Sequence, residues 1–353
     1  MQWIVDGVYL AVAVLFIVGL KAMSSPAKAR RGITWAGVGM VLATLVTFLV
    51  PGMQNMALIV VAIVLGGGVA WWAGRVVKMT DMPQMVAIYN GMGGGAAALI
   101  AAVEFARGEV HGPVVATLAV LGSLIGSVAF SGSVIAFLKL QGIMNKAFRL
   151  PAQNLVNIAL GVAAIGLGAW IVTSSVGAGT ANAWLLVLFF VLALVLGAVL
   201  TSPIGGADMP VVISLLNAFT GLAVGFEGYV LGNPTLIIAG IVVGASGTLL
   251  TQLMAKAMNR PILNVLFTPI TGEAQAGGAI EGRMKEMSAT DAAALMRYSE
   301  KVIVIPGYGM AVAGAQHKVW EMAKLLEDEG VEVKFAIHPV AGRMPGHMNV
   351  LLA

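Results

Sequence analysis

Nine apolar segments, each about 20 residues long, constrain this 353-residue chain more than any other feature. A helix of about 20 apolar residues crosses the roughly 30 Å hydrocarbon core of a bilayer. Backbone polar groups find no water at that depth, so spanning segments of this length are helices. We therefore predict a polytopic α-helical membrane domain with nine spans, at residues 3–23, 33–50, 56–74, 83–105, 113–138, 153–173, 182–201, 209–229 and 233–256.

The composition agrees with a membrane protein and excludes other classes. Hydrophobic residues make up 59% of the chain and charged residues 10%, whereas soluble domains carry about 25% charged residues. The apolar stretch at residues 3–23 starts too early and runs too long for a cleaved signal peptide. A formal charge of +4 gives no support for nucleic-acid binding, and the lack of cysteine excludes disulfides and thiol nucleophiles. We expect no metal site, because all four histidines fall in expected loops or the tail: His111, His317, His338 and His347.

Positive charge gathers at alternate ends of these spans. Lysines and arginines follow the first, third, fifth and ninth spans, whereas the even-numbered loops hold only Arg107. The positive-inside rule then predicts an external N-terminus and a cytoplasmic C-terminal tail, and an odd number of spans agrees. The residues on the cytoplasmic side are Lys21, Lys28, Arg30, Arg31, Arg75, Lys78, Lys139, Lys146, Arg149, Lys256 and Arg260.

One pattern occurs twice in the membrane domain. Residues 81–83 read Asp-Met-Pro and precede Asn90, and residues 208–210 read the same and precede Asn217 at the same spacing. Both segments enter from the cytoplasmic side, which indicates a parallel duplication rather than an inverted repeat.

The repeated Asp and Asn residues each have two interpretations. An Asp followed by Pro is an ordinary helix start, whereas the alternative for Asp81 and Asp208 is a carboxylate at the mouth of a polar path. Asn90 and Asn217 lie about 13 Å further along their helices, at 1.5 Å per residue. A polar side chain at that depth is either a hydrogen bond between helices or part of a site, and we favour a site on a proton path.

The composition changes after residue 261. We divide the chain into a transmembrane domain (1–261), a linker with a short helix (262–300) and the start of an α/β domain (301–353). Ser288 and Asp291 form a capping-box pattern that opens the short helix.

The last segment has the pattern of a β-α-β unit. A strand at 301–305 leads through a glycine turn into an amphipathic helix, which Gly330 ends before a second strand at 331–337. A complete α/β nucleotide domain needs about 150 residues, so we expect this one to be truncated.

The glycine turn is the candidate nucleotide site. Gly307, Gly309 and Val312 occupy the three positions of a Gly-x-Gly-x-x-small turn between strand and helix. Such glycines let the backbone approach a dinucleotide pyrophosphate, although an ordinary strand-to-helix turn is the alternative. His338 stands where an NAD site usually has an acidic residue, which favours NADP. Arg343 is either a phosphate clamp or a solvated loop residue.

At these residues the chain resembles the β subunit of the proton-translocating NAD(P) transhydrogenase, over essentially its whole length. The matching strings are residues 79–83, 130–139, 205–217, 257–260, 306–313 and 337–353. The resemblance implies a proton-conducting membrane domain and a Rossmann-like domain that binds NADP(H). It also implies an NAD(H)-binding α subunit, a small membrane α subunit, a dimer of the whole assembly, and a location in the bacterial inner membrane with the C-terminal domain cytoplasmic.

The resemblance assigns roles to particular residues. It implies a proton path at Asn217, Asp208 and Asn90, with no catalytic residue in this chain, because hydride passes directly between two nicotinamides. Some members carry histidine at the position of Asn90, so the titrating histidine is expected on a partner helix, and the family's NADP domain continues well beyond Ala353. The implied NADP(H) contacts are Gly307, Tyr308, Gly309, Met310, Ala311, Val312, Val340, Ala341, Gly342, Arg343, Met344 and Pro345.

A secondary transporter regulated by a cytoplasmic nucleotide domain remains the alternative. The parallel repeat and the polar residues at mid-membrane depth fit that function equally well. A transporter needs no second nucleotide, which separates the two hypotheses.

Overall fold

The structure is a computed structural model of the 353-residue chain. It describes residues 2–23, 25–50, 52–53, 55–78, 81–144, 149–178, 182–205, 208–258, 261–267, 287–338, 341 and 347–352.

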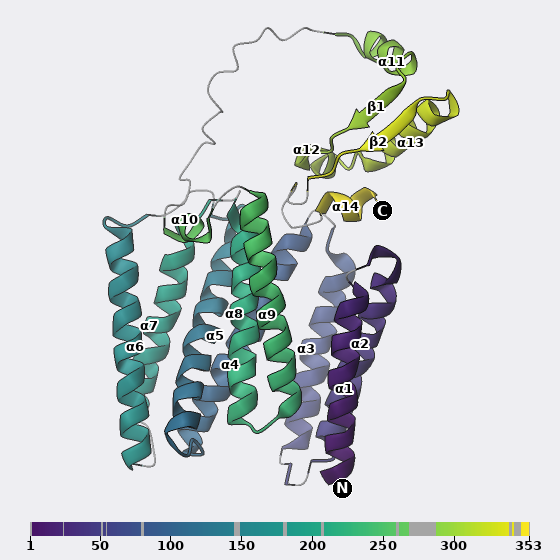
Figure 1. The fold of residues 1–353 in the computed structure, drawn as a ribbon. Coiled ribbons are helices and arrows are strands. Elements are labelled where there is room, and N and C mark those ends of the chain that lie inside the picture. Colours follow the sequence, from purple (N-terminus) through teal and green to yellow (C-terminus); the bar gives the residue numbers. More distant parts are fainter. Residues whose placement is uncertain are drawn as a thin grey trace.

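The described residues up to Ala257 form nine long helices with connecting loops, and the helices stand side by side as a bundle (Figure 1). Eight of them are long and apolar enough to cross a membrane, which confirms a polytopic helical membrane protein. The helices are α1 (Gln2–Met23), α2 (Pro26–Thr47), α3 (Met56–Val76), α4 (Met82–Arg107), α5 (Pro113–Leu140), α6 (Gln153–Ala178), α7 (Ala183–Thr201), α8 (Met209–Val230) and α9 (Pro234–Ala257).

Helix α2 accounts for the difference between eight helices and the nine predicted spans. It begins at Pro26 rather than near residue 33, and its first turns carry Lys28, Arg30 and Arg31. These cations make it too polar to qualify by composition, although its 22 residues reach about 33 Å. The helix lies against α1, so it belongs to the bundle by packing.

Helix α8 lies at the centre of the packing. It contacts α4, α5 and α9, and more of its length is buried than that of the other seven apolar helices, whereas α3 has no buried residue. Glycines allow the close approach of α9: a Cβ on Gly240 would overlap the backbone of Gly225, and one on Gly221 would lie 2.6 Å from the backbone N of Gly244. The glycine pair at 221 and 225 therefore acts through backbone contact with a neighbouring helix.

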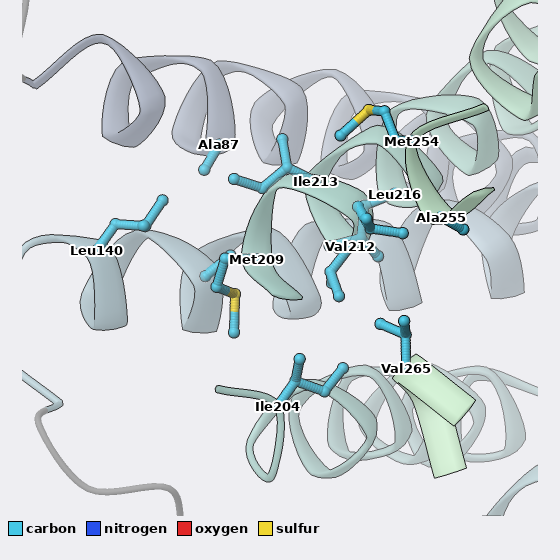
Figure 2. Packing of buried hydrophobic residues seen from close by; sticks show 12 residues of the cluster. Ala87, Leu140, Ile204, Met209, Val212, Ile213, Leu216, Met254, Ala255 and Val265 are labelled. Carbon is cyan, nitrogen blue, oxygen red and sulfur yellow. The ribbon is translucent and has the colours of Figure 1, made fainter. Parts of the chain in front are cut away.

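A hydrophobic cluster closes the end of the bundle at which α4 and α8 begin. Short helix α10 (Ile262–Phe267) contributes Val265, which is 1% exposed, and the loop after α7 contributes Ile204. Figure 2 shows these side chains around the first turns of α8; the labelled members are Ala87, Leu140, Ile204, Met209, Val212, Ile213, Leu216, Met254, Ala255 and Val265.

The C-terminal region is a short mixed α/β segment. Strands β1 (Lys301–Val304) and β2 (Glu332–Phe335) pair in parallel, with Lys301 opposite Glu332. Hydrogen bonds from Lys301 and Lys334 lower the pKa of the Glu332 carboxyl to about 2. The other elements are α11 (Ala289–Arg297), α12 (Tyr308–Val312), α13 (Gln316–Asp328) and α14 (His347–Leu352).

The predicted β-α-β pattern is confirmed, with one difference. The single helix expected after the glycine turn is broken into α12 and α13, because Gly314 adopts a left-handed φ of +61° between them. Gly330, with φ +84°, follows α13 as predicted, and Ser288 accepts a hydrogen bond from the backbone N–H of Asp291 at 3.1 Å. The described sheet has two strands, so a Rossmann-like domain is not evident in it.

Candidate functional site

Asn90 lies in the interface between α4 and α5. Its side chain is 9% exposed, and its Nδ2 donates a hydrogen bond to Oγ of Ser133 at 3.0 Å. Gly91 brings the two helices together, since a Cβ there would lie 3.0 Å from that of Ser133. The amide oxygen Oδ1 of Asn90 is buried and accepts no hydrogen bond from a described residue. Asn90 thus links two helices and keeps one acceptor for a donor that this part of the chain does not supply.

Thr220 connects α8 to the same point. Its Oγ1 donates to the backbone oxygen of Asn90 at 3.4 Å, and a Cβ on Gly94 would lie 3.2 Å from that Oγ1. The amide of Asn90 and the hydroxyls of Ser133 and Thr220 therefore meet where α4, α5 and α8 come together.

Asn217 lies one turn before Thr220 but on the outer surface of α8. Leu216 faces Gly132 of α5 and Ala218 faces Gly247 of α9, so the residue between them points outward. Asn217 is exposed, and its side chain makes no hydrogen bond to the described residues. The structure therefore does not join Asn217 to Asn90, although both lie nine residues beyond an equivalent Asp.

Glu227 is a buried carboxylate near the other end of α8. It is 1% exposed, and neither Oε1 nor Oε2 has a hydrogen-bond partner among the described residues. Its Oε1 rests against α5 at Gly122, where a Cβ would overlap it. Thr220 and Glu227 are seven residues apart, so they share a face of α8 with about 10 Å between them along the axis. A buried carboxylate is costly to keep ionised, which makes this group suited to holding a proton.

The two predicted helix starts are confirmed in position. Asp81 and Asp208 are the N-cap residues of α4 and α8, each with Pro in the first turn. Neither side chain makes the hydrogen bond of an ordinary N-cap, and Asp208 is 1% exposed, directly before Met209 of the hydrophobic cluster. Asp208 is thus a buried acid at the end of α8 opposite Glu227.

Lys139 holds the turn that leads to Asp208. Its Nζ donates to the backbone oxygens of Ile204 at 2.7 Å and Thr201 at 3.4 Å, and also to that of Ser202. These carbonyls lie at and just beyond the C-terminal end of α7, where a cation is stabilised by the helix dipole.

The glycine turn is open to the surroundings. Gly307 is the N-cap of α12, and a Cβ added to Gly307 or Gly309 would meet no atom of the described residues within 4 Å. Packing against these residues therefore gives no reason for glycine at either position, and they leave the backbone of the turn uncovered. Val312 is 62% exposed, whereas Ala311 is 4% exposed and packs inward.

The loop predicted to complete this site is described only at Ala341, which is half-buried. Val340, Gly342, Arg343, Met344 and Pro345 lie outside the described residues, so the structure does not join them to the turn. Tyr308 and Met310 are half-buried in α12. The described residues contain no group of three or more His, Asp or Glu side chains placed to hold a metal ion.

Sequence reasoning missed three of these residues. Glu227 falls near the end of an apolar segment, and Ser133 and Thr220 resemble the other small polar residues of the apolar helices. The available signal was an acidic residue within an apolar segment, which in a membrane helix is expected to face the protein interior.

The chain matches known proteins along nearly its whole length. Residues 5–353 match the family model described as "NAD(P) transhydrogenase beta subunit". Two relatives named "NAD(P) transhydrogenase subunit beta", one from Rhodospirillum rubrum and one from a named strain of that species, are each 47% identical over 358 residues. The alignments cover 98% of this chain and 76% of each relative.

Proposed function

Because the chain belongs to the family of NAD(P) transhydrogenase beta subunits, which are subunits of an enzyme, we propose that it conducts protons and binds NADP(H) in a proton-pumping transhydrogenase. In this function, hydride transfer between NAD(H) and NADP(H) is coupled to proton movement across the membrane. Residues 1–261 form the proton-translocating domain, 262–300 the linker, and 301–353 part of the Rossmann-like NADP domain.

The observation that carries the proposal is the line of buried polar groups along α4, α5 and α8. Glu227 supplies a carboxylate that can bind and release a proton at Oε1 or Oε2. Two turns along α8, Thr220 and the Asn90–Ser133 pair supply hydroxyl and amide groups that can orient water. The hydrogen bonds of Asn90 and Thr220 join helices, but the Glu227 carboxylate makes no hydrogen bond to the described residues that would stabilise the bundle, which favours a functional role for it.

Asp208 and Asn217 complete the route on the side where α8 begins. Asp208 is the acid at the cytoplasmic mouth, held in place through the turn that Lys139 binds. Asn217 is exposed at mid-membrane depth, where a polar side chain facing lipid is unfavourable. We propose that a partner helix covers it and supplies the histidine whose ordinary pKa of about 6.5 suits proton exchange.

The open glycine turn is the proposed NADP(H) contact. Bound NADP(H) carries the hydride, and the chain contributes backbone at Gly307 and Gly309 that a pyrophosphate can approach closely. The other proposed contacts are Tyr308, Met310, Ala311, Val312 and the loop from Val340 to Pro345 with Arg343 as the phosphate clamp.

The same function defines the partners and the location. We propose that an α subunit binds NAD(H), that a small membrane α subunit contributes the histidine, and that the whole assembly is a dimer. The bacterial inner membrane is crossed nine times with the N-terminus outside, which counts α2 as a span and leaves the C-terminal domain in the cytoplasm.

Proton uptake into sealed vesicles tests this function against the secondary transporter. The complete set of subunits is reconstituted, and NADPH is added with or without an NAD(H) analogue as hydride acceptor. A transhydrogenase takes up protons only when both nucleotides are present. Proton movement that proceeds equally without the second nucleotide would establish the transporter instead.

A further inference from the structure

An apolar groove lies between the α1–α2 hairpin and α9. Its volume is about 230 Å³, and its walls include Ile17, Leu20 and Met23 of α1, Ala36 of α2, and Ala239 and Val243 of α9. The hairpin stands beside α9 at one side of the bundle (Figure 1).

The groove extends from a contact between α1 and α9 toward the end of the hairpin. Thr235 donates from Oγ1 to the backbone oxygen of Tyr9 at 3.3 Å, and the groove residues follow Tyr9 along α1 and Thr235 along α9. Beyond this contact the two elements are separated by apolar space rather than by interlocked side chains.

Two lysines lie near the groove residues at the turn of the α1–α2 hairpin. Lys21 follows Leu20 and lies four residues after Ile17, so it shares a face of α1 with groove residues. Lys28 lies eight residues before Ala36 and on the same side of α2, and both lysines are exposed. Asp6, near the opposite end of α1, is the one acidic residue between positions 2 and 47. The groove is therefore apolar along its length and positively charged at one mouth.

We propose that this groove is a binding site for an anionic phospholipid, with an acyl chain along α1 and α9 and the phosphate at Lys21 and Lys28. Basic residues at the cytoplasmic membrane surface attract anionic headgroups, and an apolar groove between helices receives the chain. The bound lipid joins the hairpin to α9 where protein contacts are lacking.

Native mass spectrometry of the purified, delipidated complex tests this site. The complex is titrated with phosphatidylglycerol or phosphatidylcholine of identical acyl chains, and with glycerol phosphate to represent a free phosphate. We expect preferential binding of phosphatidylglycerol, and we expect glycerol phosphate not to displace it. The double variant Lys21→Gln with Lys28→Gln should lose about fivefold in phosphatidylglycerol affinity for each cation removed.

A matched control separates this site from general surface charge. Lys78→Gln with Arg149→Gln removes the same charge from the same membrane surface at residues that do not line the groove, and should leave phosphatidylglycerol binding unchanged. Ala239→Phe, or Ala36→Leu if the first variant folds poorly, fills the groove and should weaken both lipids while keeping their ratio.

Three results overturn the proposal. One is an equal loss of phosphatidylglycerol binding in both charge variants, which assigns the preference to net charge. The second is unchanged lipid binding in the groove-filling variants, and the third is displacement of the lipid by glycerol phosphate. The lipid site depends on the proposed function only for the membrane leaflet that it faces. Because the lipid titration needs no nucleotide, a negative result would leave the transhydrogenase proposal unchanged.

Discussion

At the scale of single residues, two asparagines that each lie nine residues after the Asp of an Asp-Met-Pro sequence have different surroundings. Asn90 is buried and bonded to Ser133, whereas Asn217 is exposed on the outer face of α8. The difference comes from neighbouring helices, since α8 buries the residues on either side of Asn217 against α5 and α9. Because the Asn217 side chain makes no hydrogen bond to the described residues, replacing it should affect function without affecting the fold.

Replacing Asn217 with leucine separates stability from proton conduction. The variant loses no hydrogen bond to the described residues, so we expect a thermal midpoint within a few degrees of the parent, and surface changes of this kind usually alter stability by less than about 0.5 kcal/mol. We expect NADPH binding to persist and proton pumping in sealed vesicles to be lost. Parental pumping rates would remove Asn217 from the route.

Gly309 tests the nucleotide turn in a chain that includes the complete NADP domain. Gly309→Val places a side chain in open space, so folding should be unaffected, but the added bulk blocks the approach of a pyrophosphate. We expect NADPH affinity, measured by calorimetric titration, to fall about tenfold or more. Ala313→Val adds the same bulk at a neighbouring exposed position and should bind NADPH normally. Equal affinities in both variants mean that the turn is structural.

The residues that sequence could not identify owe their character to contacts across helices. Glu227 is buried because Gly122 of α5 leaves space for its carboxylate, and no periodicity in α8 reveals that neighbour. The N-cap positions of Asp81 and Asp208 were predictable from Asp followed by Pro, because that signal is local. Local chemistry could thus be predicted, and burial could not.

At the scale of elements, the packing of α8 on α9 depends on glycines that the sequence indicated only in part. The pair Gly221 and Gly225 predicted a close helix contact, and the structure identifies its partners as Gly240 and Gly244. The same holds for the helix after the glycine turn, where apolar spacing predicted one helix. A left-handed φ at Gly314 divides it, and spacing alone does not report that angle.

Gly240→Ala and Gly225→Ala form a matched pair for this interface. A Cβ on Gly240 overlaps the backbone of Gly225, whereas a Cβ on Gly225 meets its nearest atom at 3.6 Å. We expect Gly240→Ala to destabilise the protein by about 1–3 kcal/mol, as for an overpacked core, and Gly225→Ala to be nearly neutral. Thermal unfolding in detergent measures both. Equal thermal midpoints for the two variants would show that α8 and α9 can move apart to accept the added methyl group without loss of stability.

At the scale of the whole molecule, whether the two ends of the chain lie on opposite sides of the membrane depends on whether α2 crosses it. Eight helices qualify as spans by composition, and the odd number required by the charge pattern is reached only if α2 also crosses. Its cations stand in the first turns, where a helix leaves the hydrocarbon core, and the remaining turns are apolar. The sequence thus predicted the topology from charge and length together, whereas composition alone omits this helix.

Single cysteines before and after α2, at the N-cap positions of α2 and α3, decide its topology, and the native chain contains no cysteine. Cysteine at Ser25 should react with an impermeant thiol reagent from the cytoplasmic side, and cysteine at Asn55 from the outside. Labelling of both positions from one side would reduce the protein to eight spans.

If buried polar groups of this chain carry the protons of a transhydrogenase, replacement of the Glu227 carboxylate should stop proton uptake. The measurement is the initial rate of proton uptake by sealed vesicles that contain the complete enzyme, supplied with NADPH and an NAD analogue. Glu227→Gln keeps the size of the side chain but cannot exchange a proton, so we expect uptake to fall at least about a hundredfold, the lower end of the effect of removing a proton-transfer group. Glu109→Gln is the control, because Glu109 is an exposed acidic residue in the loop after α4. This variant should pump at the parental rate. Uptake by Glu227→Gln at the parental rate would contradict the account.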